Sequence, residues 1–392
     1  MAELQLDPQK TAVMPFSVPF SESDLEDLQD RLGRIRWPDD APGSWEYGFD
    51  RRFLQQICAY WRNHFDWKLQ VNRLSAFHHY RYESPGLGIH FIHERGNGPS
   101  PIPLLLTHGW PGSFIEMLRI IPLLTDPAAN GGDATDVFDV VVPSLPGFGF
   151  SDRPVRGGMN TSRVADLWAE LMTELGYDRF AAQGGDIGAG VSTMLGLRYP
   201  QRIIGVHLNY IPGSYRPCLD DQPELSPVEH DFLKSVARWS EDNGAYAHIQ
   251  RTRPQTAAYG LNDSPVGLAA WILEKFHDWS DSDGDLFRSL NQDELLTNVT
   301  LYWITQTISS SFRMYYENRK APLQFGRGDF VRPPCAVALF PKEISCPPRE
   351  WVERGYNVQR WTKLPRGGHF AAMEEPDLLA NEIRAFFRRF RN

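Results

Sequence analysis

The segment 184–188 reads Gly-Gly-Asp-Ile-Gly and places a reactive residue in the pattern Gly-x-nucleophile-x-Gly. This pattern is typical of a strained turn from a strand into a helix, where the glycines let the backbones approach closely. The nucleophile position usually carries serine, but here it carries Asp186. A carboxylate is already ionised at neutral pH and needs no base to activate it. Asp186 therefore favours displacement at a saturated carbon over acyl transfer.

Expected strands and helices alternate on both sides of this turn. The expected strands are apolar on both faces, which is typical of a parallel sheet covered on both sides. They lie at residues 102–107, 138–142, 180–183, 203–208, 335–340 and 357–362. The pattern predicts the α/β class and an α/β-hydrolase fold, with a mostly parallel sheet and helices on both faces.

Capping residues locate several of the helices in this alternation. Ser113 and Glu116 form the pattern of a capping box at the start of one helix. Thr161 is expected to cap a helix at 162–175. The remaining expected helices of the alternating region cover residues 190–198 and 376–390.

Two regions interrupt the alternation and suggest four segments. The expected segments are an N-terminal extension at 1–98, a first core part at 99–212, a helical lid at 213–325 and a second core part at 326–392. The extension is expected to be a helical and irregular meander, with one helix capped by Ser23 and a second at 53–67. The lid shows helical patterns, such as 267–277 and 294–317, and no convincing strand. An insertion at the strand-end face would cover the site.

A histidine and an acid are expected to follow the nucleophile in chain order. His369, in a Gly-Gly-His-Phe segment between the last strand and the closing helix, fits the histidine. Glu343 follows the first strand after the lid and fits the acid. On spacing alone, Glu343 is equally well explained as an exposed loop residue.

Two backbone N–H groups are expected to stabilise an oxyanion. One is that of Ile187, at the start of the helix after the turn, and the other is that of Trp110, in the loop after the strand 102–107. Trp110 could also be a core aromatic, but glycines and a proline surround it. The glycine-rich turn at 143–149 lacks Gly-Lys-Ser/Thr, so a nucleotide site is not predicted.

Composition excludes several other classes of protein. The net charge of −9 gives no support for nucleic-acid binding. Four dispersed cysteines predict reduced thiols in a cytoplasmic protein. No secretory signal and no membrane span are expected. The histidines at 78, 79, 90 and 93 lack the partners of a metal site, and the acidic stretch 281–284 is expected to be a solvated turn, so no metal is predicted.

Further motifs accompany these residues along nearly the whole chain. They read Arg-Trp-Pro-Asp at 36–39, Phe-Asp-Trp at 65–67, Ile-His-Phe-Ile-His at 89–93, His-Gly-Trp-Pro-Gly-Ser at 108–113 and Gly-Gly-His-Phe at 367–370. With these motifs, the chain resembles the epoxide hydrolases of the microsomal type within the α/β-hydrolase superfamily. Residues 77–80, Phe-His-His-Tyr, depart from the proline-containing stretch expected there.

The resemblance implies hydrolysis of an epoxide to a vicinal diol in two steps, without a cofactor. Asp186 would form an alkyl ester, and the histidine–acid pair would clear it. Two lid tyrosines would act as proton donors. Tyr246 matches the context of the first, and the second is Tyr315 by register from residues 301–303, with the adjacent Tyr316 as the alternative.

Two other functions share parts of this pattern. A haloalkane dehalogenase also uses an aspartate nucleophile with a histidine–acid pair, but it needs N–H donors for halide rather than phenols. An inactive homologue that binds ligand would keep the fold alone. Abundant aromatic residues in the lid favour an apolar or aromatic epoxide. The particular epoxide and a possible homodimer stay open.

Overall fold

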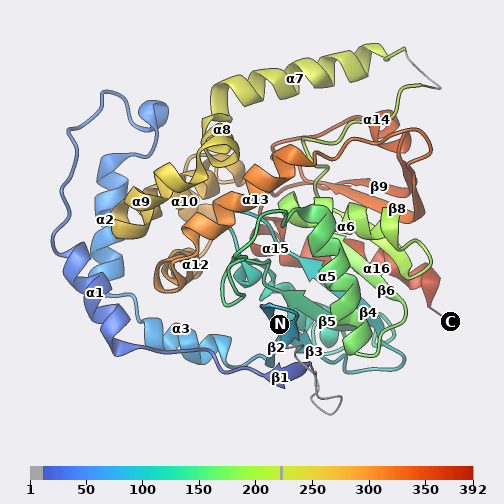
Figure 1. The fold of residues 1–392 in the computed structure, drawn as a ribbon, viewed down its shortest axis with the longest axis horizontal. Coiled ribbons are helices and arrows are strands. Elements are labelled where there is room, and N and C mark those ends of the chain that lie inside the picture. Colours follow the sequence, from blue (N-terminus) through green and yellow to red (C-terminus); the bar gives the residue numbers. More distant parts are fainter. Residues whose placement is uncertain (1–11, 221–223, 392) are drawn as a thin grey trace, which may run out of the picture.

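The computed structural model describes residues 12–220 and 224–391. Within these residues lies a nine-stranded sheet of order β1-β2-β3-β5-β4-β6-β7-β8-β9 (Figure 1). Strands β4 to β9 pair in parallel, which confirms the predicted sheet type. Their bounds are β4 Ile102–Thr107, β5 Phe138–Pro143, β6 Phe180–Gly184, β7 Ile203–Leu208, β8 Val331–Leu339 and β9 Tyr356–Lys363.

The N-terminal segment adds antiparallel strands that the sequence analysis missed. They are β1 Val13–Pro15, β2 His79–Ser84 and β3 Leu87–Glu94, and β3 pairs with β5 of the parallel sheet. The expectation of a helical and irregular extension is wrong for these residues. The missed signal is the two-residue turn Pro85-Gly86, because proline followed by glycine at positive φ (+76°) is a turn that joins adjacent strands.

Two helices begin at caps other than the expected ones. Ser21, rather than Ser23, caps α1 (Glu22–Leu32) and accepts a backbone N–H three residues on. Asn160 caps α5 (Thr161–Glu174), so the threonine expected as the cap is the first helical residue. In both cases several neighbouring polar residues could cap the helix. The cap is the residue just before the first helical residue, because its extended backbone lets its side chain reach a free N–H of the first turn.

Two predicted long helices differ from the structure. The helix expected at 53–67 is α2 (Arg51–Asn63), which ends four residues early, and an unpredicted helix α3 (Trp67–Leu74) follows, capped by Asp66, which accepts the N–H of Leu69. The segment expected at 294–317 forms α12 (Gln292–Thr305) and α13 (Ile308–Lys320). Gln306 between them has a left-handed backbone (φ +53°), which ends α12.

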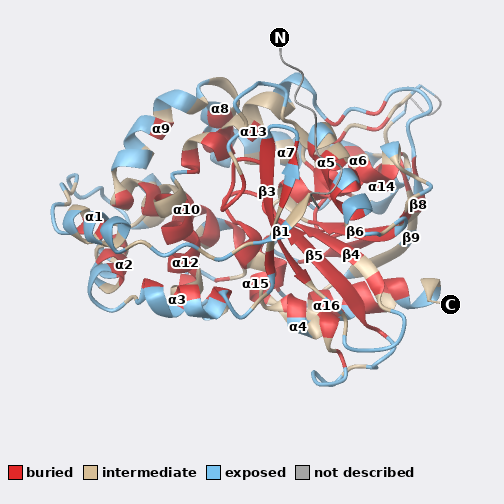
Figure 2. Cartoon of the chain, turned by 60° about the horizontal axis from the view of Figure 1, so that its bottom comes forward, coloured by how far each residue is buried: buried red, intermediate tan, exposed pale blue. Residues whose placement is uncertain are grey.

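Helices cover both faces of the sheet. Leu105 of β4 belongs to the hydrophobic cluster of α5 and α6, whereas Leu104 and Leu106 belong to the cluster of α4 and α16. Alternate side chains of a strand point to opposite faces, so these clusters are two layers of core. Figure 2 shows the central strands as buried. The other elements outside the lid are η1 Trp45–Tyr47, η2 Phe114–Met117, α4 Ile120–Thr125, α6 Asp186–Arg198, α14 Arg349–Glu353, α15 Ala371–Glu374, α16 Pro376–Phe387 and η3 Arg388–Phe390.

A group of helices lies between β7 and β8 in the chain and beside the carboxyl ends of the strands (Figure 1). Besides α12 and α13 it contains α7 Pro227–Asn243, α8 Ala245–Thr252, α9 Pro254–Asp263, α10 Pro265–Trp279 and α11 Leu286–Ser289. The N-terminal helices pack on it. The indole N–H of Trp61 donates to Thr300 Oγ1 at 2.9 Å, and the Trp45 ring stacks on His277 at 3.6 Å. The extension therefore supports the helices that cover the site.

Several histidines are buried in a neutral form. Burial lowers the pKa of His93, His108 and His207 to about 4 and that of His90 well below its usual value. His207 is the simplest case, since neither ring nitrogen has a hydrogen-bond partner among the described protein groups. Each of these side chains therefore resists protonation in the folded state.

We predict that stability decreases with acid because of these histidines. Below pH about 6.5 the unfolded chain binds more protons than the folded chain, so stability is lost as the pH falls towards 4. For His207 alone, the loss between pH 8 and pH 5 is about 2 kcal/mol. His207→Leu should reduce the difference in urea-unfolding free energy between these pH values, whatever its effect at pH 8. An unchanged difference would contradict the prediction.

Candidate active site

Asp186 lies at the turn between β6 and α6. Its φ of +44° is in the left-handed region, which residues other than glycine rarely adopt. The flanking glycines allow the close approach that the turn requires. A Cβ atom on Gly184 would overlap the backbone of Gly188, and one on Gly188 would overlap the carbonyl of Thr107. The turn thereby holds the Asp186 carboxylate against the loop that follows β4.

Both predicted amide groups contact the Asp186 carboxylate. The N–H of Trp110 donates to Oδ1 at 2.8 Å, and the backbone of Ile187 also hydrogen-bonds the carboxylate. Burial raises the pKa of Asp186, whereas the charge of His369 and the two amides act in the opposite direction. The structure therefore brings the N–H groups of Trp110 and Ile187 to the Asp186 carboxylate.

His369 and Glu343 form a buried pair next to this carboxylate. His369 Nδ1 lies 2.6 Å from Glu343 Oε1, and its Nε2 lies 3.7 Å from Asp186 Oδ2. Burial by itself lowers the pKa of His369, but the charge and hydrogen bond of Glu343, together with the charge of Asp186, raise it to about 9. Glu343 is 7% exposed, so the alternative of an exposed loop glutamate is wrong.

Glu374 holds the loop that carries His369. Its Oε1 accepts the N–H of Phe370 at 2.9 Å, and its Oε2 accepts those of Gly368 at 3.1 Å and Asp281 at 2.7 Å. Burial raises the pKa of Glu374 to about 7. Asp281 does not simply lie in a solvated turn, because its carboxylate accepts an N–H from the same loop at 2.8 Å. These bonds tie the loop to the end of α10.

The two preferred tyrosines face each other over Trp110. Tyr246 comes from α8 and Tyr315 from α13, and their ring centroids are 6.1 Å apart. The Trp110 ring stacks on Tyr246 at 5.3 Å and meets Tyr315 edge-on at 5.8 Å. A side-chain hydrogen bond couples the two phenols, and burial raises the pKa of both. Tyr316 instead lies under Lys320, whose ammonium is 4.1 Å from its ring centroid.

Glu116 does not form the predicted capping box. Ser113 accepts the N–H of Ile115 at 3.3 Å, and the short 3-10 helix η2 begins there instead of an α-helix. The Glu116 side chain folds over Gly112, where a Cβ atom would overlap its carboxyl group. It also receives a hydrogen bond from the backbone of Gly109. A third carboxyl group therefore lies at the active centre.

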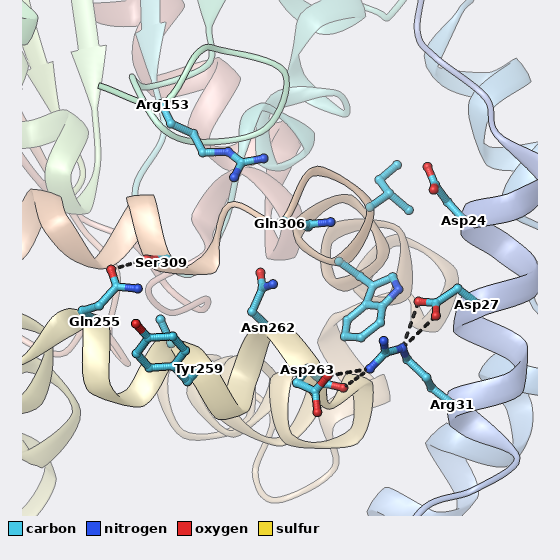
Figure 3. Close-up of a pocket in the computed structure, with 13 residues that line it drawn as sticks. Asp24, Asp27, Arg31, Arg153, Gln255, Tyr259, Asn262, Asp263, Gln306 and Ser309 are labelled. Carbon is cyan, nitrogen blue, oxygen red and sulfur yellow. Dashed lines mark hydrogen bonds and ion pairs between the residues drawn. The ribbon is translucent and has the colours of Figure 1, made fainter. Parts of the chain in front are cut away.

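Two cavities differ in their relation to these groups. A small one of about 10 Å³ is lined by Asp186 and His369, with Glu116 and Gln183 beside them. A wider one of about 410 Å³ lies between α1, α9 and the turn joining α12 to α13 (Figure 3). There Arg31 bridges Asp27 and Asp263. The wider cavity contains none of the predicted site residues, whereas Asp186, His369 and Trp110 line the small one.

No group of three or more possible metal ligands occurs among the residues that the structure describes. His79 and His90, from the histidine-rich stretch, hydrogen-bond each other at 2.8 Å. His79 also contacts the Leu74 carbonyl, and His90 contacts the hydroxyl of Ser144. Across the same described ranges, no helix is long and apolar enough to cross a membrane.

Comparison with known proteins gives a consistent family assignment. The family model described as "Epoxide hydrolase N terminus" matches residues 13–117, and that of the "alpha/beta hydrolase fold" matches residues 102–376. Epoxide hydrolase 1 of Oryctolagus cuniculus is 40% identical over 96% of this chain and 88% of its own length. The chain belongs to the epoxide hydrolase family.

Two further relatives extend this assignment. A relative from Stigmatella aurantiaca is 46% identical over 97% of this chain and 86% of its own length. The crystal structure of the juvenile hormone epoxide hydrolase of Bombyx mori is 30% identical, with a TM-score of 0.86 over 98% of this chain and 96% of its own. The α/β-hydrolase fold predicted from the sequence is therefore confirmed, and the chain is a hydrolase of this family.

The sequence analysis of this epoxide hydrolase missed Glu116 and Glu374. Glu116 was assigned to a local cap, and only its position in the folded loop shows otherwise. Glu374 follows His369 by five residues, at the end of α15 and just before the closing helix, and this proximity was an available signal. The choice of Tyr315 rested on a continuous helix from residue 301. That helix is broken at Gln306, so the register argument no longer holds, and the support for Tyr315 comes from its ring contacts with Trp110 and Tyr246.

We predict that Glu374→Ala lowers turnover at least tenfold. Without the carboxylate, three backbone N–H groups lose their acceptor, each at about 1–3 kcal/mol, and the His369 loop is no longer held. Steady-state turnover of a model epoxide and thermal unfolding measure the two effects. Glu353→Ala, which removes a surface ion pair with Arg349, serves as the control. Equal activity of the two variants would contradict the role of Glu374.

Proposed function

We propose that this epoxide hydrolase converts an epoxide and water into a vicinal diol through an alkyl ester on Asp186. The observation that carries this proposal is the convergence of three elements on one carboxylate. These are the amides of Trp110 (at Oδ1) and Ile187, the His369–Glu343 pair at Oδ2, and the phenols above Trp110. Each element matches one requirement of the reaction.

In the first step, Asp186 attacks a ring carbon of the epoxide. The carbon–oxygen bond of the ring breaks, and its electron pair remains on the oxygen. That oxygen would leave as a poor alkoxide unless it is protonated. Tyr246 and Tyr315 supply the proton, because burial raises their pKa values and keeps both phenols protonated at neutral pH. Such proton donation contributes on the order of 10²–10⁴ in rate.

In the second step, His369 removes a proton from water, and the water oxygen attacks the carboxyl carbon of Asp186. The N–H groups of Trp110 and Ile187 stabilise the oxyanion, each by roughly 10²–10³ in rate. The ester bond then breaks, and the product oxygen takes the proton held by His369. The diol leaves, and the carboxyl proton left on Asp186 returns to the tyrosinate formed in the first step. Esterification removes the charge of Asp186, which is one cause of the raised pKa of His369. The histidine therefore becomes a neutral base more readily once the ester has formed.

The surroundings favour an apolar or aromatic substituent on the epoxide. Besides the two tyrosines, the Trp110 ring lies next to the rings of Phe312 and Trp279, with centroid separations of 5.9 Å and 6.4 Å. A pair of phenols suits an oxygen leaving group better than the halide of a dehalogenase. The four cysteines are free thiols, which supports a cytoplasmic location.

We predict that His369→Gln accumulates a covalent adduct. Asp186 can still be alkylated in this variant, but water is no longer activated. Intact-mass spectrometry after mixing with a model epoxide should show the enzyme heavier by one substrate. Asp186→Asn should show neither the adduct nor diol formation. Diol formation by Asp186→Asn at the wild-type rate would rule out the covalent mechanism.

The tyrosine assignment gives a separate prediction. Tyr246→Phe and Tyr315→Phe should each slow alkylation by about tenfold or more, and the double variant by on the order of 10²–10⁴. Tyr316→Phe is the matched control and should alkylate at the wild-type rate, since its ring lies under Lys320. Rapid mixing with excess enzyme isolates this step. A larger loss in Tyr316→Phe than in Tyr315→Phe would reverse the assignment.

A further inference from the structure

We propose that the small cavity beside Asp186 binds the hydrolytic water and that Glu116 positions this water for attack on the ester. The inference rests on the proposed covalent mechanism and adds a residue to its second step. It gives a function to a carboxyl group that neither the fold nor the alkylation step uses.

The cavity has the size and the polar lining of a site for one water molecule. Its volume of about 10 Å³ corresponds to about one water, which needs two to four polar partners. His369 and Glu116 both line it. Gln183 is fully buried in its wall, and its Oε1 has no partner among the described protein groups, although its Nε2 donates to Asn209 at 2.8 Å. A water at this point would have His369 Nε2 and the Glu116 carboxyl group as acceptors for its two O–H groups, with the Gln183 carbonyl as an alternative acceptor.

The position of Glu116 has no evident structural purpose. Among the described residues, no lysine or arginine acts on its carboxyl group, and it does not cap η2. Placing a carboxyl group in a partly buried site without such a partner disfavours the folded state. Gly112 leaves the space that the carboxyl group occupies, and the Gly109 backbone holds it. The loop is thus built to present Glu116 to the active centre.

The geometry assigns each hydrogen of the water a separate acceptor. One O–H donates to His369 Nε2 and is the bond that breaks, and the other donates to Glu116 and stays intact. The water oxygen then directs a lone pair at the carboxyl carbon of Asp186. Burial raises the pKa of Glu116 to about 8, and the charge of Asp186 adds to this effect while His369 opposes it. Ester formation removes the Asp186 charge, which favours the carboxylate form that accepts a hydrogen bond.

The test separates the two half-reactions in Glu116→Gln, which keeps the shape of the side chain. Rapid quenching with excess enzyme, followed by intact-mass analysis, measures the formation and the decay of the adduct with a model epoxide. We expect formation within about threefold of the wild-type rate and decay at least tenfold slower. Gly112→Ala should reproduce this pattern, because its Cβ atom would displace the Glu116 carboxyl group. Glu353→Gln on the surface is the control.

The outcomes distinguish this inference from the proposed function. Adduct decay at the wild-type rate in Glu116→Gln would overturn the role of Glu116. Equal slowing of formation and decay, with a lower thermal midpoint, would show a structural role and would also overturn it. His369→Gln is measured in parallel. If that variant formed no adduct, the covalent mechanism itself would fail, whereas an adduct in His369→Gln with normal decay in Glu116→Gln would reject only the present inference.

Discussion

The rest of the active site depends on one constraint, a carboxylate held at a left-handed turn and taken largely out of water. Asp186 has a positive φ, and its side chain is 16% exposed. Such a backbone conformation disfavours the folded state by about 1–3 kcal/mol, and burial of the charge adds to that. The surrounding groups offset both effects. The amides of Trp110 and Ile187 and the charge of His369 all favour the ionised carboxylate, and the same groups are what an ester on Asp186 would need.

The outer parts of the molecule position these groups. Trp110 contacts the lid through Tyr246 and Tyr315, so the loop that provides an amide also sets the place of the phenols. The N-terminal extension packs on the opposite side of the lid through Trp61 and Trp45. Glu374 connects the His369 loop to the end of α10. The candidate site therefore lies largely in a few loops, each held by a separate element of the fold.

Local patterns predicted the elements whose signals do not depend on distant contacts. Strands β4 and β7 begin and end where their apolar runs do, and the predicted residues Asp186, His369 and Glu343 lie next to one another in the structure. The predictions were wrong where several local structures compete. Neighbouring polar residues offered alternative caps for α1 and α5, and the left-handed backbone at Gln306 divided one predicted helix into α12 and α13. Of the missed extension strands, β1 is short and pairs with the distant β2, and β3 joins the parallel sheet through the distant β5. The hairpin of β2 and β3 is local, and its Pro-Gly turn was an available signal.

The sequence by itself determined the fold class and indicated Asp186 as the candidate nucleophile, because an acidic residue between glycines and a repeated alternation of strands and helices are local patterns. Only the tertiary structure decided which tyrosine meets Tyr246, since the break at Gln306 removes the register on which a sequence argument relies. It alone also moved Glu116 from a helix cap to the active centre. The local pattern permits both positions for this side chain. The choice is made by the space over Gly112, by the hydrogen bond from the Gly109 backbone and by the charge of His369, which comes from a distant part of the chain.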